Sequence, residues 1–417
     1  MDSLQFLLGL ALILFSTKAL GLLTRKFKMP QVVGALLAGL LLGPAVFNVM
    51  GSTDFIEQVA EIGVIVLMFG AGVETDLQDL KKSGGPAFII AMMGVIVPVV
   101  GGFAVASIFY PAAGPDQHLI LLQNIFIGVI LSATSVSITV ETLKELGKLT
   151  TKSGNAILGA AIIDDIIGIV ALTLITSMAD TSIRISTIVF QLVGFFAFSG
   201  IAGYLFFRFY KKWTDSYGSD LRRFIIIAFT FCLVMSYCAD RFFGVADITG
   251  AYIAGLIISC TNVKEYVAKR FDTLSYMMFS PVFFASIGLK VTVPNFSTSM
   301  LMFTVALVLV AVLSKVVGCG IGAKLCRYDN HDALCIGCGM ISRGEVALIV
   351  ANKGAAVGLM SPELFAPVVL IVMFTSIVSP ILLKIAYAHH TPSPGDAFQE
   401  DAITRSVNHQ LELNQGM

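Results

Sequence analysis

The chain alternates between long apolar blocks and short polar segments that carry most of its charge. Thirteen blocks are apolar enough to cross a membrane, since a hydrocarbon core of about 30 Å needs roughly 20 such residues per helix. The third and ninth blocks are short. The blocks are continuous, which excludes the alternating strands of a membrane barrel. The pattern predicts an all-α polytopic membrane protein with about 13 transmembrane helices, at residues 3–23, 31–50, 58–73, 86–109, 119–140, 153–178, 186–207, 224–239, 246–260, 271–289, 297–323, 333–352 and 364–387.

Composition supports the same class. Of the 417 residues, 56% are hydrophobic and 13% are charged, whereas about a quarter of an average soluble domain is charged. The 27 basic and 27 acidic residues cancel, so the chain has no basic field for nucleic acid. The lipid bilayer is therefore the expected environment, and nucleic acid is not an expected partner.

The distribution of lysine and arginine predicts an orientation. With the N-terminus outside, the inward loops and the tail hold 20 of these residues and the outward loops hold four, namely Arg184, Arg241, Lys290 and Lys353. Basic residues concentrate in cytoplasmic loops. No basic segment precedes the first block, which is typical of a retained helix rather than a cleaved signal peptide. We expect a cytoplasmic C-terminus, with a disordered polar tail at 389–417.

An internal repeat relates two parts of the chain. The stretch Gly34–Leu40 (GALLAGL) matches Gly250–Leu256 (GAYIAGL) at an offset of 216 residues, and Gly72 matches Gly288 at the same offset. The matched blocks are seven apart, so the two copies cross the bilayer in opposite senses. Inverted repeats of this kind are typical of secondary transporters, whose sites lie near the midplane where broken helices meet.

Two adjacent acids, Asp164 and Asp165, lie in the middle of the sixth block. A charge at the centre of a membrane helix costs about 2.5–3.5 kcal/mol, and such residues usually face a site inside the protein. A pair of neighbouring carboxylates can hold a monovalent cation when ionised or protons when not. Competition between these occupants would couple cation and proton movement. An inert buried ion pair is the alternative.

Lys315, in the eleventh block, is a candidate for the compensating charge. It lies well inside the block, so one interpretation pairs it with an aspartate. The alternative is a lysine whose long side chain reaches the cytoplasmic interface near Lys324.

Polar clusters interrupt the fifth and twelfth blocks. The fifth contains Thr134 and Ser135, and the twelfth contains Ser342, Arg343, Gly344 and Glu345. Helix interruption is tolerated at membrane depth where the backbone lines a cavity, and the partial charges of the freed helix ends could be neutralised by Arg343 and Glu345. For the fifth block, ordinary bonding of hydroxyls to helix carbonyls remains an alternative. Cys335 and Cys338 resemble half of a zinc or redox site, but without a second half they favour simple packing.

Taken together, these motifs resemble the sodium/proton antiporters of the second monovalent cation:proton antiporter family. The resemblance covers essentially residues 1–388, and its motifs are Val33-Gly34-Ala35 with Gly39 and Gly43-Pro44, Ala133-Thr134-Ser135, Ile163-Asp164-Asp165, Lys315-Val316-Val317-Gly318 and Ser342-Arg343-Gly344-Glu345.

The resemblance implies a homodimer with two crossed discontinuous helices. Residues 1–73 and 224–290 would form a dimerisation domain, residues 74–180 and 291–388 a mobile ion-translocating core, and residues 181–223 a linker. Asp165 would be the main carrier of cation and proton, with Asp164 as its partner bonded to Lys315. Thr134 and Ser135 would line the site.

The double aspartate resembles the electrogenic members of that family, which exchange more than one proton per sodium ion. Kef-type potassium/proton relatives usually carry Gln-Asp and a C-terminal nucleotide-sensing domain. This chain shows neither feature, which favours sodium or lithium. We therefore expect a Na⁺ or Li⁺ for H⁺ antiporter of a bacterial inner membrane, which is not an enzyme and needs no cofactor. A K⁺/H⁺ antiporter is the first alternative. A cation channel would show charged rings along a pore, and an intramembrane protease would need its two aspartates on facing helices.

Overall fold

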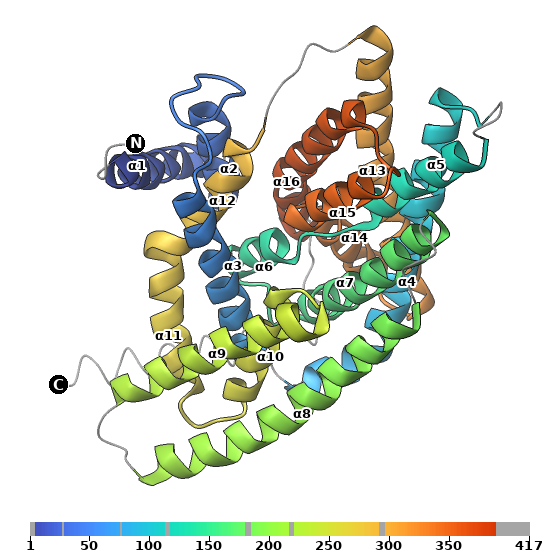
Figure 1. The fold of residues 1–417 in the computed structure, drawn as a ribbon. Coiled ribbons are helices and arrows are strands. Elements are labelled where there is room, and N and C mark those ends of the chain that lie inside the picture. Colours follow the sequence, from blue (N-terminus) through green and yellow to red (C-terminus); the bar gives the residue numbers. More distant parts are fainter. Residues whose placement is uncertain are drawn as a thin grey trace.

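The computed structural model describes residues 5–26, 29–75, 77–112, 117–179, 185–216, 221–291 and 297–388 (Figure 1). Within these ranges the regular structure is entirely helical, as the sequence predicts. The elements are α1 (Gln5–Lys26), α2 (Gln31–Leu42), α3 (Asp54–Glu74), α4 (Leu77–Phe109), α5 (Gln117–Ser132), α6 (Val136–Glu145), α7 (Lys152–Ala179), α8 (Ile185–Ser216), α9 (Leu221–Phe243), α10 (Asp247–Ser259), α11 (Lys264–Leu274), the π-helix η1 (Ser275–Phe279), α12 (Ser280–Leu289), α13 (Thr298–Leu325), α14 (Asn330–Gly339), α15 (Glu345–Ala356), the 3₁₀ turn η2 (Pro362–Leu364) and α16 (Phe365–Ala388).

Each predicted block overlaps a helical segment, and nine helical spans in the described ranges are long and apolar enough to cross a membrane. Several predicted limits differ from the observed helix ends, and two of these differences have a local cause. The second block ends at Leu42 rather than at residue 50, because Gly43 is extended and Pro44 follows it. The third block is not short, since α3 begins at Asp54, where Thr53 caps it by accepting a hydrogen bond from the Ile56 amide. The number of membrane crossings stays a prediction, and the tail at 389–417 lies outside the described residues.

The helices pack in two bundles that lie on opposite sides of Figure 1. The first bundle consists of α1–α3 and α9–α12, in which α2 packs on α1 and α12, and α3 packs on α10. The second bundle consists of α4–α7 and α13–α16, with α4 packed on α5, α7 and α13. Helix α8 contacts α7, α9 and α10. The two bundles meet where α6 contacts α2 and α3 and where α16 contacts α2, a surface that we call the seam.

The glycines matched by the repeat are points of closest backbone approach in the first bundle. A Cβ on Gly39 would lie 1.9 Å from the Ala285 carbonyl oxygen, and a Cβ on Gly288 would lie 2.7 Å from the Gly39 carbonyl carbon. A Cβ on Gly72 would lie 3.0 Å from the Gly255 Cα. At the offset of 216 residues, Gly39 corresponds to Gly255 and Gly72 to Gly288. The contact between α2 and α12 therefore has its counterpart between α10 and α3.

Candidate functional site

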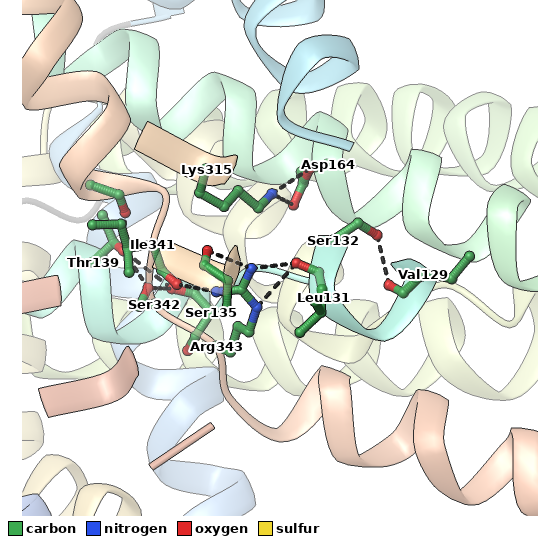
Figure 2. Close-up of polar contacts among 12 residues, drawn as sticks. Val129, Leu131, Ser132, Ser135, Thr139, Asp164, Lys315, Ile341, Ser342 and Arg343 are labelled. Atoms are coloured by element: carbon green, nitrogen blue, oxygen red, sulfur yellow. Dashed lines mark hydrogen bonds and ion pairs between the residues drawn. The ribbon is translucent and has the colours of Figure 1, made fainter. Parts of the chain in front are cut away.

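The two predicted helix interruptions exist and cross each other. The helical structure is interrupted at residues 133–135, between α5 and α6, and at residues 341–344, between α14 and α15. The Ser135 amide donates to the Ser342 carbonyl oxygen at 2.7 Å, and the Ser342 hydroxyl donates to the Ser135 carbonyl oxygen at 2.9 Å (Figure 2). A Cβ on Gly344 would lie 2.6 Å from Ser135 Oγ, so a larger residue at this position would force the Ser135 side chain to move. The crossing places four helix ends around one point.

Arg343 lies at the crossing and is completely buried. Its guanidinium donates to the Leu131 carbonyl oxygen through Nε, at 3.1 Å, and through Nη2. It also donates to the carbonyl oxygens of Ile341, at 2.9 Å, and Ala311, at 3.0 Å. Leu131 lies in the last turn of α5, whose carbonyls carry partial negative charge. The structure therefore places the positive charge of Arg343 at this helix end. Glu345 is the first residue of α15, and its side chain lies outside the described part of the structure.

Asp164 on α7 and Lys315 on α13 form a buried ion pair. Lys315 Nζ lies 3.2 Å from Asp164 Oδ1 and 3.1 Å from Oδ2 (Figure 2). Lys315 is 0% exposed and Asp164 is 2% exposed. The predicted pairing is therefore present, and the alternative of a lysine that reaches the interface is wrong.

Helix α4 closes over this pair through a glycine. A Cβ on Gly94 would lie 2.7 Å from Cys319 Sγ, 3.6 Å from Lys315 Nζ and 3.9 Å from Asp164 Oδ1. A side chain at position 94 would therefore displace the cysteine, while its Cβ would be in van der Waals contact with the ion pair.

Asp165 and Thr134 complete the buried polar centre. They are 7% and 1% exposed, and Thr134 Oγ1 lies outside hydrogen-bonding geometry with the described residues. The Ser135 hydroxyl is 3.2 Å from that of Ser137. Carboxylate and hydroxyl oxygens are ligands that hard cations prefer, so this centre offers ligand atoms of the kind that a hard cation needs.

A cavity of about 210 Å³ leads from the two aspartates along the space between the bundles. The second bundle lines it with Asp164, Asp165 and Ser132, and the first bundle adds acidic side chains. Four charged lining residues were missed by the sequence analysis: Glu61, Asp240, Asp247 and Lys353. Each lies near the end of an apolar block, where a charge facing a cavity has the same sequence pattern as one facing water.

The two cysteines Cys335 and Cys338 are buried and free on α14. This agrees with the packing interpretation of their spacing.

Residues 11–388 match the family model described as sodium/hydrogen exchanger, transmembrane. The chain belongs to this family. The sodium/hydrogen exchanger family is one of transporters rather than enzymes, and this member is a multi-pass integral membrane protein. It is 36% identical over 387 residues to the Na⁺/H⁺-K⁺ antiporter GerN of Bacillus cereus. This match covers 92% of this chain and 96% of GerN. It is 37% identical to the Na⁺/H⁺ antiporter of Enterococcus hirae over 390 residues, 91% of this chain and 98% of that protein.

The fold of this sodium/hydrogen exchanger is similar to that of the sodium proton antiporter MjNhaP1 from Methanocaldococcus jannaschii. The TM-score is 0.67, and the match covers 93% of this chain and 98% of that chain at 17% sequence identity. At this identity the likeness supports the fold alone.

Proposed function

We propose that the protein is a secondary antiporter that exchanges Na⁺ or Li⁺ for H⁺ by alternating access. The observation that carries this proposal is the buried acid pair at the crossing of two helix breaks, with Asp164 held by Lys315. Burying a charged centre of this kind inside a membrane bundle costs free energy, and such centres usually bind an ion or substrate. The names of the relatives support cation/proton exchange.

In this proposal Asp165 is the main carrier, and Thr134 and Ser135 line the site. Ionised carboxylates bind the cation, and protonation removes the negative charge that holds it. The same centre therefore releases one kind of ion when it takes up the other. Asp164 shares its charge with Lys315, so protonation of Asp164 would leave the lysine without its counter-ion. The two acids together can carry more than one proton per cation, which makes the exchange electrogenic.

The two bundles support the division of labour that the sequence implies. Residues 1–73 and 224–290 would form the dimerisation domain of a homodimer, residues 74–180 and 291–388 the moving core, and residues 181–223 the linker. The reciprocal contacts Gly39–Gly288 and Gly255–Gly72 support an inverted repeat within the first bundle. The asymmetry of basic residues supports an external N-terminus and a cytoplasmic C-terminus. The bacterial relatives support a bacterial plasma membrane as the location.

The Asp-Asp motif supports membership of the second monovalent cation:proton antiporter family. Potassium is retained as a second candidate cation, because one relative is named a Na⁺/H⁺-K⁺ antiporter. Fluorescence dequenching in everted vesicles, with Na⁺, Li⁺ and K⁺ compared across pH, tests the proposal. We expect saturable, pH-dependent dequenching by Na⁺ and Li⁺. A response that does not saturate, or one that is absent with every cation, would contradict the proposal.

A further inference from the structure

Helix α6 is tied to the first bundle by charged side chains at one end of the seam. Lys144 Nζ lies 3.0 Å from Glu74 Oε1 on α3 and 2.7 Å from Asp272 Oδ1 on α11. The side chains of Lys144 and Glu74 are only 24% and 27% exposed. One lysine of the second bundle thus joins two helices of the first.

The neighbouring residue, Glu145, binds the N-terminus of α2. Its Oε1 and Oε2 accept hydrogen bonds from the Gln31 amide at 2.9 and 2.7 Å. The residue at the N-cap position is Pro30, whose side chain offers no cap. A carboxylate at this position satisfies an unpaired donor and interacts favourably with the helix dipole. The cap of a first-bundle helix is therefore supplied by the second bundle.

The site opens toward the other end of the space between the bundles, away from Lys144. The cavity that contains Asp164 and Asp165 is lined by Glu61, in the N-terminal half of α3, and by Asp240 and Asp247, where α9 ends and α10 begins. At the Lys144 end there is a separate cavity of about 610 Å³, lined by Lys18, Lys144 and Glu145 among others. Asp164, Asp165 and Thr134 do not contribute to that lining. The binding centre thus opens away from Lys144.

We propose that Lys144 and Glu145 form a latch that closes the cytoplasmic side of the site and stabilises the outward-facing state. This inference rests on the proposed antiport by alternating access. Helix α6 follows directly on the helix break at residues 133–135, so movement of the site relative to the first bundle displaces α6 and breaks both contacts. The latch lies at the end that the basic residues assign to the cytoplasm. The latch favours the outward-facing state over the inward-facing one without contacting the transported ion.

Weakening the latch should change the affinity on the two sides in opposite directions. The apparent dissociation constant on each side equals the intrinsic one divided by the population of the state that faces that side. The variant Lys144→Met should therefore lower the apparent KM for Na⁺ on the cytoplasmic side and raise it on the outer side, each by roughly 3- to 10-fold. A merely structural defect would impair both sides in the same direction.

The experiment measures Na⁺/H⁺ exchange in right-side-out and everted vesicles. Lys144→Arg keeps the charge and should resemble the wild type. Asp272→Asn, which leaves the Lys144–Glu74 pair in place, should give the same opposite changes at smaller size. Lys324→Met is the matched control, since Lys324 binds only the nearby Tyr328 carbonyl within the second bundle among the described contacts. It should leave both KM values unchanged.

Equal changes on both sides, or none, in Lys144→Met would overturn the latch while leaving the antiport intact. If Lys144→Met does not reach the membrane, Asp272→Asn and Glu145→Gln decide the question by the same opposite changes. Absence of exchange by the wild type in either kind of vesicle would overturn the proposed function, and with it the latch.

Discussion

Lys315 on α13 holds both carboxylate oxygens of Asp164 on α7, and the lysine is completely buried. Two charges removed from water in this way are tolerable only together. The neighbouring Asp165 lines a cavity that reaches the site from one side. In the proposed mechanism Lys315 balances the charge of Asp164, and Asp165 is the carboxyl group that takes up the transported ion.

We expect Asp165→Asn to abolish exchange while the protein stays folded. The amide has nearly the same shape as the acid but neither releases a proton nor attracts a cation. Sodium-driven proton movement in proteoliposomes should fall to the level of empty vesicles. Glu265→Gln, a change of an exposed acid on α11, is the matched control and should keep full activity. Near-normal exchange by Asp165→Asn would rule out its role as carrier.

Asp164→Asn should lower or remove the electrogenicity of exchange. One titratable group is lost, so fewer protons accompany each cation. The current on a supported membrane, measured with a Na⁺ jump at fixed pH, reports the net charge moved per cycle. An unchanged response to membrane potential would count against this assignment.

Lys315→Met should destabilise the protein, because it leaves Asp164 buried without its partner. Loss of one member of a buried pair typically costs about 3–5 kcal/mol. The double variant Asp164→Asn/Lys315→Met removes both charges and should recover much of the stability. Thermal unfolding in detergent, followed by size-exclusion chromatography, makes the comparison. Equal losses in the single and the double variant would show that the ion pair is not the cause.

Gly94→Ala should impair both stability and exchange, since its methyl group would meet Cys319 Sγ and approach the ion pair. Overpacking of this kind costs about 1–3 kcal/mol. The added change Cys319→Ala makes room and should restore part of both properties. Gly85→Ala on the same helix is the control, because a Cβ there has nothing within 4 Å. If Cys319→Ala restores neither stability nor exchange in the Gly94→Ala protein, the contact with Cys319 is not the cause of the defect.

Much of the fold was predictable, because a membrane imposes strong conditions on sequence. Apolar blocks of about 20 residues must become helices, and buried charges such as Asp164 and Lys315 must find partners. The polar interruptions at Thr134–Ser135 and Ser342–Gly344 likewise indicated broken helices. In these cases a local pattern is sufficient, since the bilayer leaves few alternatives.

The residues that sequence reasoning missed depend on which side of a helix faces which neighbour. Asp240 and Asp247 lie at block ends, where charge is ordinary, and only the packing of α3 beside α9 and α10 brings them to the cavity with Glu61. Lys144 was one of many basic residues assigned to the cytoplasmic side. Its contacts with Glu74 and Asp272 join segments far apart in the chain, and no local pattern encodes such a meeting.

The account depends on a site that binds a cation and protons in alternation, and proton release on Na⁺ binding tests this most directly. Purified protein in weakly buffered solution is mixed with Na⁺, near the pH at which the site is partly protonated, and a pH-sensitive dye follows the protons. Since cation binding favours the ionised carboxylates, the wild type should release protons, and the apparent dissociation constant for Na⁺ should rise as pH falls. Asp165→Asn should release fewer or none. Saturable Na⁺ binding by the wild type without proton release, or release that is unchanged in Asp165→Asn, would contradict the account.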